Sequence, residues 1–176
     1  MSLSSWLADP FIIRNLTYGV EDSLVSTTGV LAGIHYAGVP RSVLLMTGII
    51  LILVEATSMS YGAFIAEDSF LQAAKESHSV ARVLLYAAVM LVSYVVAGMI
   101  PMLPFIFEWK QPVTISIALA VLSLFILIVS FQRNIYKAFI LTFCGLVVMF
   151  ISVQIGKVLD KNMFEKSSTT DRDPKA

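Results

Sequence analysis

The sequence predicts an all-α membrane protein, a five-transmembrane-helix bundle, from its composition and the length of its apolar stretches. Hydrophobic residues make up 57% of the 176 residues and charged residues only 14%, whereas soluble domains carry about 25% charged residues. Crossing a bilayer takes about 20 helical residues, and backbone groups within lipid must bond internally. Five stretches meet this length: Leu16–Tyr36, Ser42–Ala66, Ser79–Ile100, Pro112–Phe131 and Tyr136–Val158.

The segments outside these spans are short and polar. Residues 1–15 contain Trp6 and Phe11, and we expect them to form either an interfacial amphipathic piece or a disordered segment. Residues 16–158 form one transmembrane domain. Residues 159–176 are charged and rich in Ser and Thr, which predicts a disordered polar tail.

Prolines and polar residues mark the predicted connections. The Gly-Pro turn within Ala37–Arg41 makes the first two helices antiparallel neighbours. The longest internal connection is the polar stretch from Glu67 to His78, which we expect to be a loop. Pro101 and Pro104 are expected to end the third helix.

Several functional classes are disfavoured. A formal net charge of zero argues against a nucleic-acid partner. The single Cys144 excludes an intramolecular disulfide, and His35 and His78 stand apart from any nucleophile or phosphate-binding motif. We therefore expect neither an enzyme nor a bound cofactor. No basic segment precedes the first span, and its acids would interrupt a signal peptide, so we expect this span to be retained.

The basic residues of the short connections predict the orientation. Arg14, Lys75, Arg82, Arg133 and Lys137 fall on the side of the N-terminus, against Arg41 and Lys110 on the other. Because cytoplasmic loops are enriched in Lys and Arg, we expect a multi-pass protein with a cytoplasmic N-terminus. The basic residues after Val158 oppose this orientation, and the sequence does not indicate which membrane is crossed.

Three carboxylates, Glu21, Asp22 and Glu55, interrupt the first two spans. An acid at the bilayer centre costs about 2.5–3.5 kcal/mol, so such acids usually face a partner, a cavity or an ion. At about 1.5 Å per residue, Asp22 and Met59 lie at similar depths on antiparallel helices. Glu55 lies one turn deeper than Met59 on the same helical face. These positions predict a cation path between the two helices.

The neighbouring residues suit such a path. Ser26 and Ser58 add hydroxyl ligands, and the thioether of Met59 favours iron, and manganese less strongly, over hard cations. Small residues allow close helix packing, which we assign to Gly29, Gly33 and Gly62. Glu67, Asp68, Glu76 and His78 are candidates for a cytosolic entrance.

Each assignment has a structural alternative. Glu21 and Asp22 lie near a helix N-terminus, where acids complement the helix dipole. Glu55 would serve structure if it were protonated and hydrogen-bonded, and methionine often fills gaps in packed cores. The residues from Glu67 to His78 would equally suit a solvated loop.

Three motifs resemble those of one family. The run from Tyr18 to Gly33, Tyr-Gly-Val-Glu-Asp-Ser-Leu-Val-Ser-Thr-Thr-Gly-Val-Leu-Ala-Gly, resembles the first-helix motif of the vacuolar iron transporter family, with Asp22 on its aspartate. Ser58 to Phe64 resembles the family's Ser-Met-x-x-Gly-Glu-Tyr/Phe. Pro101 to Phe105 resembles the Pro-Leu-Leu-Pro that closes its third helix. The resemblance covers about Leu16 to Val158.

The resemblance implies a homodimer that moves ferrous iron, and often manganese, out of the cytosol in exchange for protons, with Asp22 and Met59 among the ligands. The chain departs from the family at Ala63, where the motif has glutamate, and at Ser23, where it has glycine. Glu55 is a candidate substitute for the missing acid. The chain also lacks the family's cytosolic metal-binding insertion between helices two and three.

Two hypotheses follow. The first is a transporter in the lipid bilayer that exports divalent transition metal ions against protons, as a homodimer. The alternative is a non-transporting structural or accessory membrane subunit whose small-residue stripes pack helices against a partner.

Overall fold

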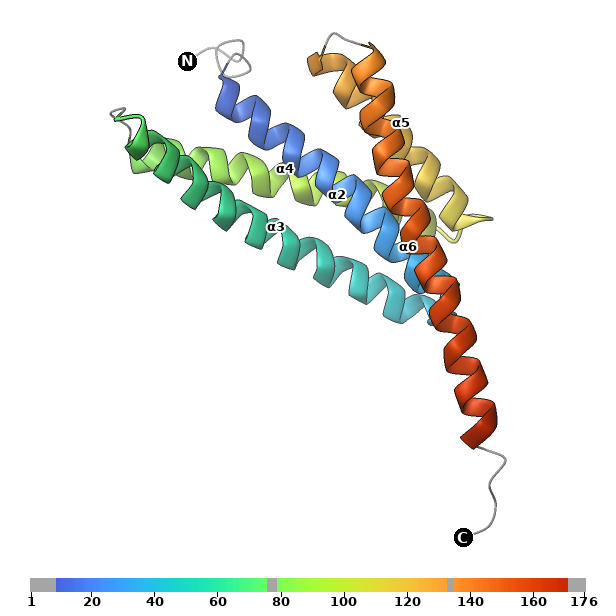
Figure 1. The fold of residues 1–176 in the computed structure, drawn as a ribbon. Helices are drawn as coiled ribbons and strands as arrows, with labels where there is room; N and C mark the ends of the chain where they lie inside the picture. The colour runs from blue at the N-terminus through green and yellow to red at the C-terminus, as the bar shows by residue number, and fades with distance from the viewer. Residues whose placement is uncertain (1–8, 76–78, 133–134, 171–176) are drawn as a thin grey trace.

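The computed structural model describes residues 9–75, 79–132 and 135–170, which form five helices. These are α2 (Pro10–Tyr36), α3 (Arg41–Ala73), α4 (Val80–Ile106), α5 (Pro112–Gln132) and α6 (Ile135–Thr170) (Figure 1). The predicted all-α fold is confirmed over this part of the chain.

Helix α2 lies at the centre of the bundle and contacts each of the other four helices (Figure 1). It begins at Pro10, preceded by Asp9, whose carboxylate accepts a hydrogen bond from the backbone nitrogen of Phe11 at 2.9 Å. Proline suits this first position because its missing N–H has no partner in the first turn. The central position lets α2 bury polar residues, namely Asn15, Ser23, Thr27 and Thr28.

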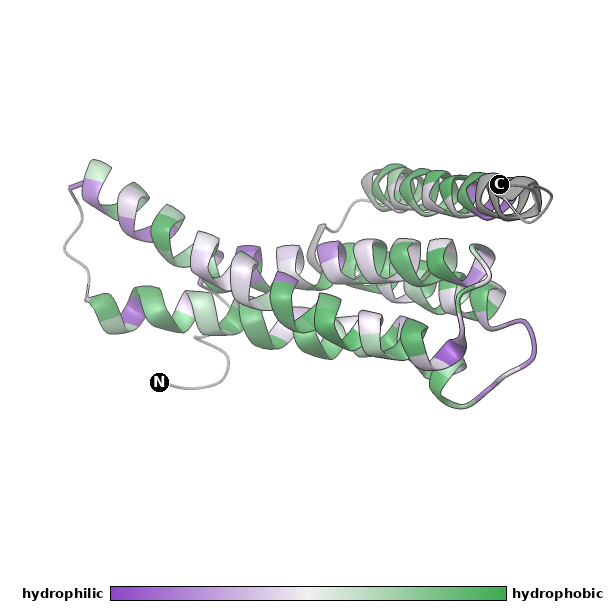
Figure 2. Cartoon of the chain, turned by 90° about the horizontal axis from the view of Figure 1, so that it is seen from below, coloured by the Kyte–Doolittle hydropathy of each residue, from purple (hydrophilic) through white to green (hydrophobic). Residues whose placement is uncertain are grey.

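Four of the five helices are long and apolar enough to cross a membrane: Arg41–Ala73, Val80–Ile106, Pro112–Ser130 and Ala138–Lys161. Hydrophobic residues predominate along the helices in Figure 2. Helix α2, which the sequence predicts as the first span, is not among the four. Arg14, Asn15, Glu21 and Asp22 make it more polar than its neighbours, and its contacts with all four of them compensate for this polarity.

Helices α2, α3 and α6 extend well beyond their predicted ends, as does α4, described below. Helix α2 starts at Pro10, so part of the expected N-terminal segment is helical. Helix α3 continues to Ala73, where the sequence predicts a loop from Glu67, and α6 continues to Thr170, past the predicted end at Val158. Both extensions lack Gly and Pro and are rich in good helix formers, which explains why the helices continue. Residues 1–8 and 171–176 lie outside the described residues.

Helix α4 runs through Pro101 and Pro104 and ends at Ile106, not at the first proline as predicted. Its end is held by side chains of neighbouring helices. The Ser116 hydroxyl donates to the carbonyl of Pro101 at 2.9 Å. The Arg41 guanidinium donates to the carbonyls of Phe105 and Ile106 at 2.8 and 2.7 Å. The bonds from Arg41 satisfy carbonyls of the last turn, which the helix itself leaves unpaired.

Helices α2 and α6 approach closely along glycines. A Cβ added at Gly156 would overlap the carbonyl oxygen of Gly33, and one added at Gly29 would lie 2.8 Å from Ser152 Oγ. Gly29 and Gly33 therefore pack α2 against α6 within the chain. This contact brings α6 beside the acidic face of α2.

Candidate metal-transport site

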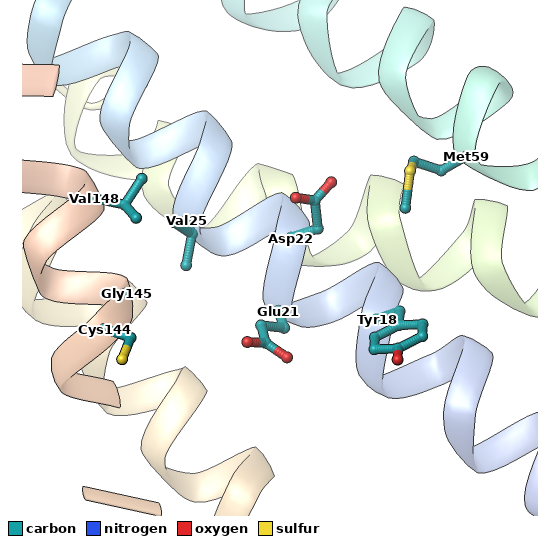
Figure 3. A pocket seen from close by; sticks show the side chains of 8 residues that line it. All are labelled: Tyr18, Glu21, Asp22, Val25, Met59, Cys144, Gly145 and Val148. Atoms are coloured by element: carbon teal, nitrogen blue, oxygen red, sulfur yellow. The ribbon is translucent and has the colours of Figure 1, made fainter. Parts of the chain in front are cut away.

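A pocket of about 470 Å³ opens on the acidic face of α2. Figure 3 shows its lining from three helices: Tyr18, Glu21, Asp22 and Val25 of α2, Met59 of α3, and Cys144, Gly145 and Val148 of α6. The four α2 residues are spaced i, i+3, i+4 and i+7, which places them on one helical face.

The two carboxylates of the pocket point in different directions (Figure 3). Asp22 points toward Met59 of α3, whereas Glu21 points toward the side of α6 that carries Cys144. Asp22 is exposed and Glu21 is half-buried. The Asp22 carboxylate and the Met59 thioether thus face a common space and could contact one ion.

Glu55 is not among the residues that line this pocket. Its Oε2 accepts hydrogen bonds from the Ser26 hydroxyl of α2, at 3.1 Å, and from the Tyr94 hydroxyl of α4. The two hydroxyl oxygens lie 2.8 Å apart, so either hydroxyl can donate to the other in place of Glu55. We call Glu55, Ser26 and Tyr94 the hydroxyl network.

The three acids are electrostatic neighbours. The charge of Glu55 acts on Asp22, and the charge of Asp22 acts on Glu21. Like charges repel at these separations, especially where the surroundings are apolar. A bound cation would relieve this repulsion.

Ser58 and Gly62 lie on the exposed side of α3. Neither lines the pocket, and a Cβ added at Gly62 would meet no atom within 4 Å. Gly62 therefore does not pack helices within the described part of the chain, unlike Gly29 and Gly33.

The candidate entrance residues are not gathered in a loop. Glu67 is a helical residue of α3, 1% exposed, and it is ion-paired with Arg14 of α2. Asn15 Nδ2 donates to Glu67 Oε1 at 3.0 Å. Asp68 accepts a hydrogen bond from Gln72 within the same helix at 2.6 Å. Glu76 and His78 lie outside the described residues.

The described residues include no group of three or more His, Cys, Asp and Glu side chains arranged to hold a metal ion. The donors that share a space are one carboxylate and one thioether, from Asp22 and Met59, with Glu21 and Cys144 farther along the same pocket.

Tyr94 and Cys144 belong to the site, although the sequence does not mark them as site residues. A tyrosine within an apolar span needs a partner for its hydroxyl, which is a signal that Tyr94 has one. The signal does not name the partner, because that depends on how α4 is rotated against α2 and α3. Cys144 carries no comparable signal, since cysteine is common in apolar helices.

The model of the VIT family matches residues 13–85, which comprise most of α2, all of α3 and the start of α4. This segment, less than half of the chain, is similar to the VIT family. No curated protein sequence matches the chain. The VIT family is one of membrane metal-ion transporters, and the four helices that are long and apolar enough to cross a membrane agree with a multi-pass membrane protein. The matched segment contains Asp22, Glu55 and Met59 but ends before Tyr94.

Proposed function

We propose that this protein exports a divalent transition metal, ferrous iron and less readily manganese, from the cytosol in exchange for protons, as its similarity to the VIT family over residues 13–85 suggests. The observation that carries the proposal is the shared space of the Asp22 carboxylate and the Met59 thioether in one pocket. An oxygen donor beside a sulfur donor suits a borderline cation better than Mg²⁺ or Ca²⁺.

Glu55 supplies the proposed exchange. A carboxylate within a membrane bundle holds either a proton or a cation, so the arrival of a metal expels the proton and its departure recovers one. The electrostatic contact between Glu55 and Asp22 supports this role, because a cation at Asp22 acts on Glu55 as well.

We further propose that two copies share the site. Asp22 is exposed, and an exposed acid in a membrane span needs a partner. Ser58 and Gly62 lie on the exposed side of α3, four residues apart, and their small side chains would let a second helix approach closely. A homodimer would bring two sets of Asp22 and Met59 together, with the N-termini in the cytosol.

Transport into liposomes that contain a ferrous-sensitive dye tests the proposal. Asp22→Asn and Glu55→Gln are each expected to lower the initial rate of iron influx at least tenfold. Glu108→Gln removes an exposed acid at the far end of α4 and should leave the rate unchanged. A pH dye inside the liposomes should report alkalinisation as iron enters. Wild-type influx in Asp22→Asn would overturn the scheme.

The alternative is a structural subunit that packs against a partner, and it is favoured by the small, exposed residues Ser58 and Gly62, which have no helix against them within the described chain. Metal-dependent thermal stability separates the two functions. A metal that binds the native state at 100 times its Kd stabilises it by about 2.7 kcal/mol. Ferrous iron should therefore raise the Tm of the wild-type protein but not that of Asp22→Asn, whereas a packing subunit should show no shift in either.

A further inference from the structure

Tyr94 of α4 holds Glu55 in a position that the sequence does not reveal. Tyr94 is fully buried, and its hydroxyl reaches across to α3 to donate to Glu55 Oε2. The second donor to the same oxygen is Ser26 of α2. Three helices thus meet at one carboxylate oxygen, and α4 takes part in the site although it contributes nothing to the pocket lining.

Close packing of α4 against α2 and α3 fixes the position of Tyr94. Ser23 Oγ donates to the backbone carbonyl of Tyr94 at 2.6 Å. One turn further along α4, a Cβ added at Gly98 would lie 2.6 Å from Ser23 Oγ and 2.9 Å from Ile52 Cγ1. The backbone of α4 therefore sits tightly against α2 and α3 at this level, which holds the tyrosine ring in place.

The bonds to Tyr94 and Ser26 engage Glu55 while it lies outside the pocket that Asp22 and Met59 line. Hydroxyls and a cation compete for the same carboxylate lone pairs. Because the two hydroxyl oxygens lie within hydrogen-bond distance of each other, one hydroxyl can donate to the other once the carboxylate leaves them.

We propose that Tyr94 is a positioning residue that draws Glu55 off a bound cation and thereby speeds its release. The inference rests on the proposed transport function. Glu55 alternates between the cation beside Asp22 and the hydroxyls of Tyr94 and Ser26, so the hydroxyl network supplies the replacement partner each time the ion departs.

Tyr94→Phe tests this role, because it keeps the ring and removes only the hydroxyl. Without the Tyr94 hydroxyl, which competes with the cation for the Glu55 carboxylate, Glu55 stays on the cation longer. Initial rates of iron influx into liposomes should show both KM and the maximal rate lowered, each by roughly ten- to hundredfold, as expected from losing one hydrogen bond to a charged group. A merely structural tyrosine would lower the maximal rate through loss of folded protein and leave KM unchanged.

Tyr86→Phe is the matched control. Tyr86 is also buried in α4, two turns earlier, and its hydroxyl donates to Asp9 at 3.0 Å, remote from Glu55. It should retain the wild-type KM. In a Glu55→Gln background, with iron binding measured by the shift in Tm, adding Tyr94→Phe should change the shift by less than twofold, since Tyr94 acts through the carboxylate.

The outcomes separate the two proposals. Wild-type transport together with a Tyr94→Phe variant that keeps the wild-type KM, or whose KM rises, would refute the role of Tyr94 alone. No transport by the wild-type protein would refute the proposed function and the role of Tyr94 with it.

Discussion

Met59 brings a thioether into the pocket that holds the Asp22 carboxylate. Replacing it with leucine keeps the side-chain volume and removes the soft donor. Met59→Leu is therefore expected to lower iron uptake several-fold while changing manganese uptake less.

The measurement for Met59→Leu is the ratio of iron to manganese influx when both are offered together. Met90→Leu, in the buried core of α4, is the control and should keep the wild-type ratio. An unchanged ratio in Met59→Leu would show that the thioether does not select the metal.

The ion pair of Arg14 and Glu67 ties the N-terminal half of α2 to the C-terminal end of α3. Arg14→Gln would leave the buried Glu67 carboxylate without its cation. Because the Arg14 side chain is 43% exposed and solvent screens part of the interaction, we expect a loss of about 1–2 kcal/mol in the free energy of unfolding.

Thermal unfolding in detergent checks this value, with the double variant Arg14→Gln, Glu67→Gln as the comparison. The double variant should regain part of the lost stability, since it no longer buries an unpaired charge. A single variant as stable as the wild type would mean that Glu67 is protonated, or that its charge is compensated otherwise.

At the level of single residues, the sequence predicts how deep a side chain lies along its helix better than it predicts the hydrogen-bond partner of that side chain. The rise of a helix places Asp22 and Met59 at one level, and both line one pocket. The bond from Tyr94 to Glu55 depends on the rotation of α4 about its axis, which the nearly uniform apolar sequence around Tyr94 does not encode.

The packing of α2 against α6 depends on glycine at specific positions. A valine at Gly156 would clash with the backbone of Gly33 and force the two helices apart. Gly156→Val is expected to cost at least about 2 kcal/mol of stability, in line with other overpacked cores. Gly62→Ala meets open space within the chain and should be neutral or stabilising by up to about 1 kcal/mol.

Tm measurements on both glycine variants check this pair. We expect a lower Tm for Gly156→Val than for Gly62→Ala. Both positions lie in helices, but an added side chain would meet backbone atoms at Gly156 and open space at Gly62. Equal changes in Tm would mean that helix propensity alone determines the stability of both variants, and that the close approach of α2 and α6 does not contribute to it.

Helix boundaries were the least predictable feature at the scale of elements. Hydropathy falls after Ala66 and Val158, so the predicted spans end there, whereas a helix ends where its backbone bonding stops. Glu67 continues α3 because Arg14 and Asn15 of α2 supply its partners. Pro101 and Pro104 do not stop α4, whose last turn is held by Arg41 bonds to the carbonyls of Phe105 and Ile106. At the ends of α3 and α4, contacts with other helices therefore add to local helix propensity, and hydropathy alone does not contain them.

The proposed dimer is a property of the whole molecule. Ser58 is exposed on α3, one residue from Met59, and Cys144 is the chain's single cysteine. In a Cys144→Ser background, Ser58→Cys is therefore expected to cross-link two copies under mild oxidation in membranes. The product should migrate at twice the monomer mass on a non-reducing gel.

Leu122→Cys in the same background is the control, because Leu122 is exposed on α5 and does not line the pocket. It should cross-link much less. Equal cross-linking at both positions, or none at Ser58→Cys, would count against a dimer formed along α3.

The central place of α2 bears on how the chain enters its membrane. This helix precedes the other four described helices in the chain, yet it is the one that is not apolar enough for a span, while α3, α4, α5 and α6 are. We expect α2 to insert stably into the membrane only after the later helices pack around its acidic residues. Stable insertion of the protein would then require its C-terminal half.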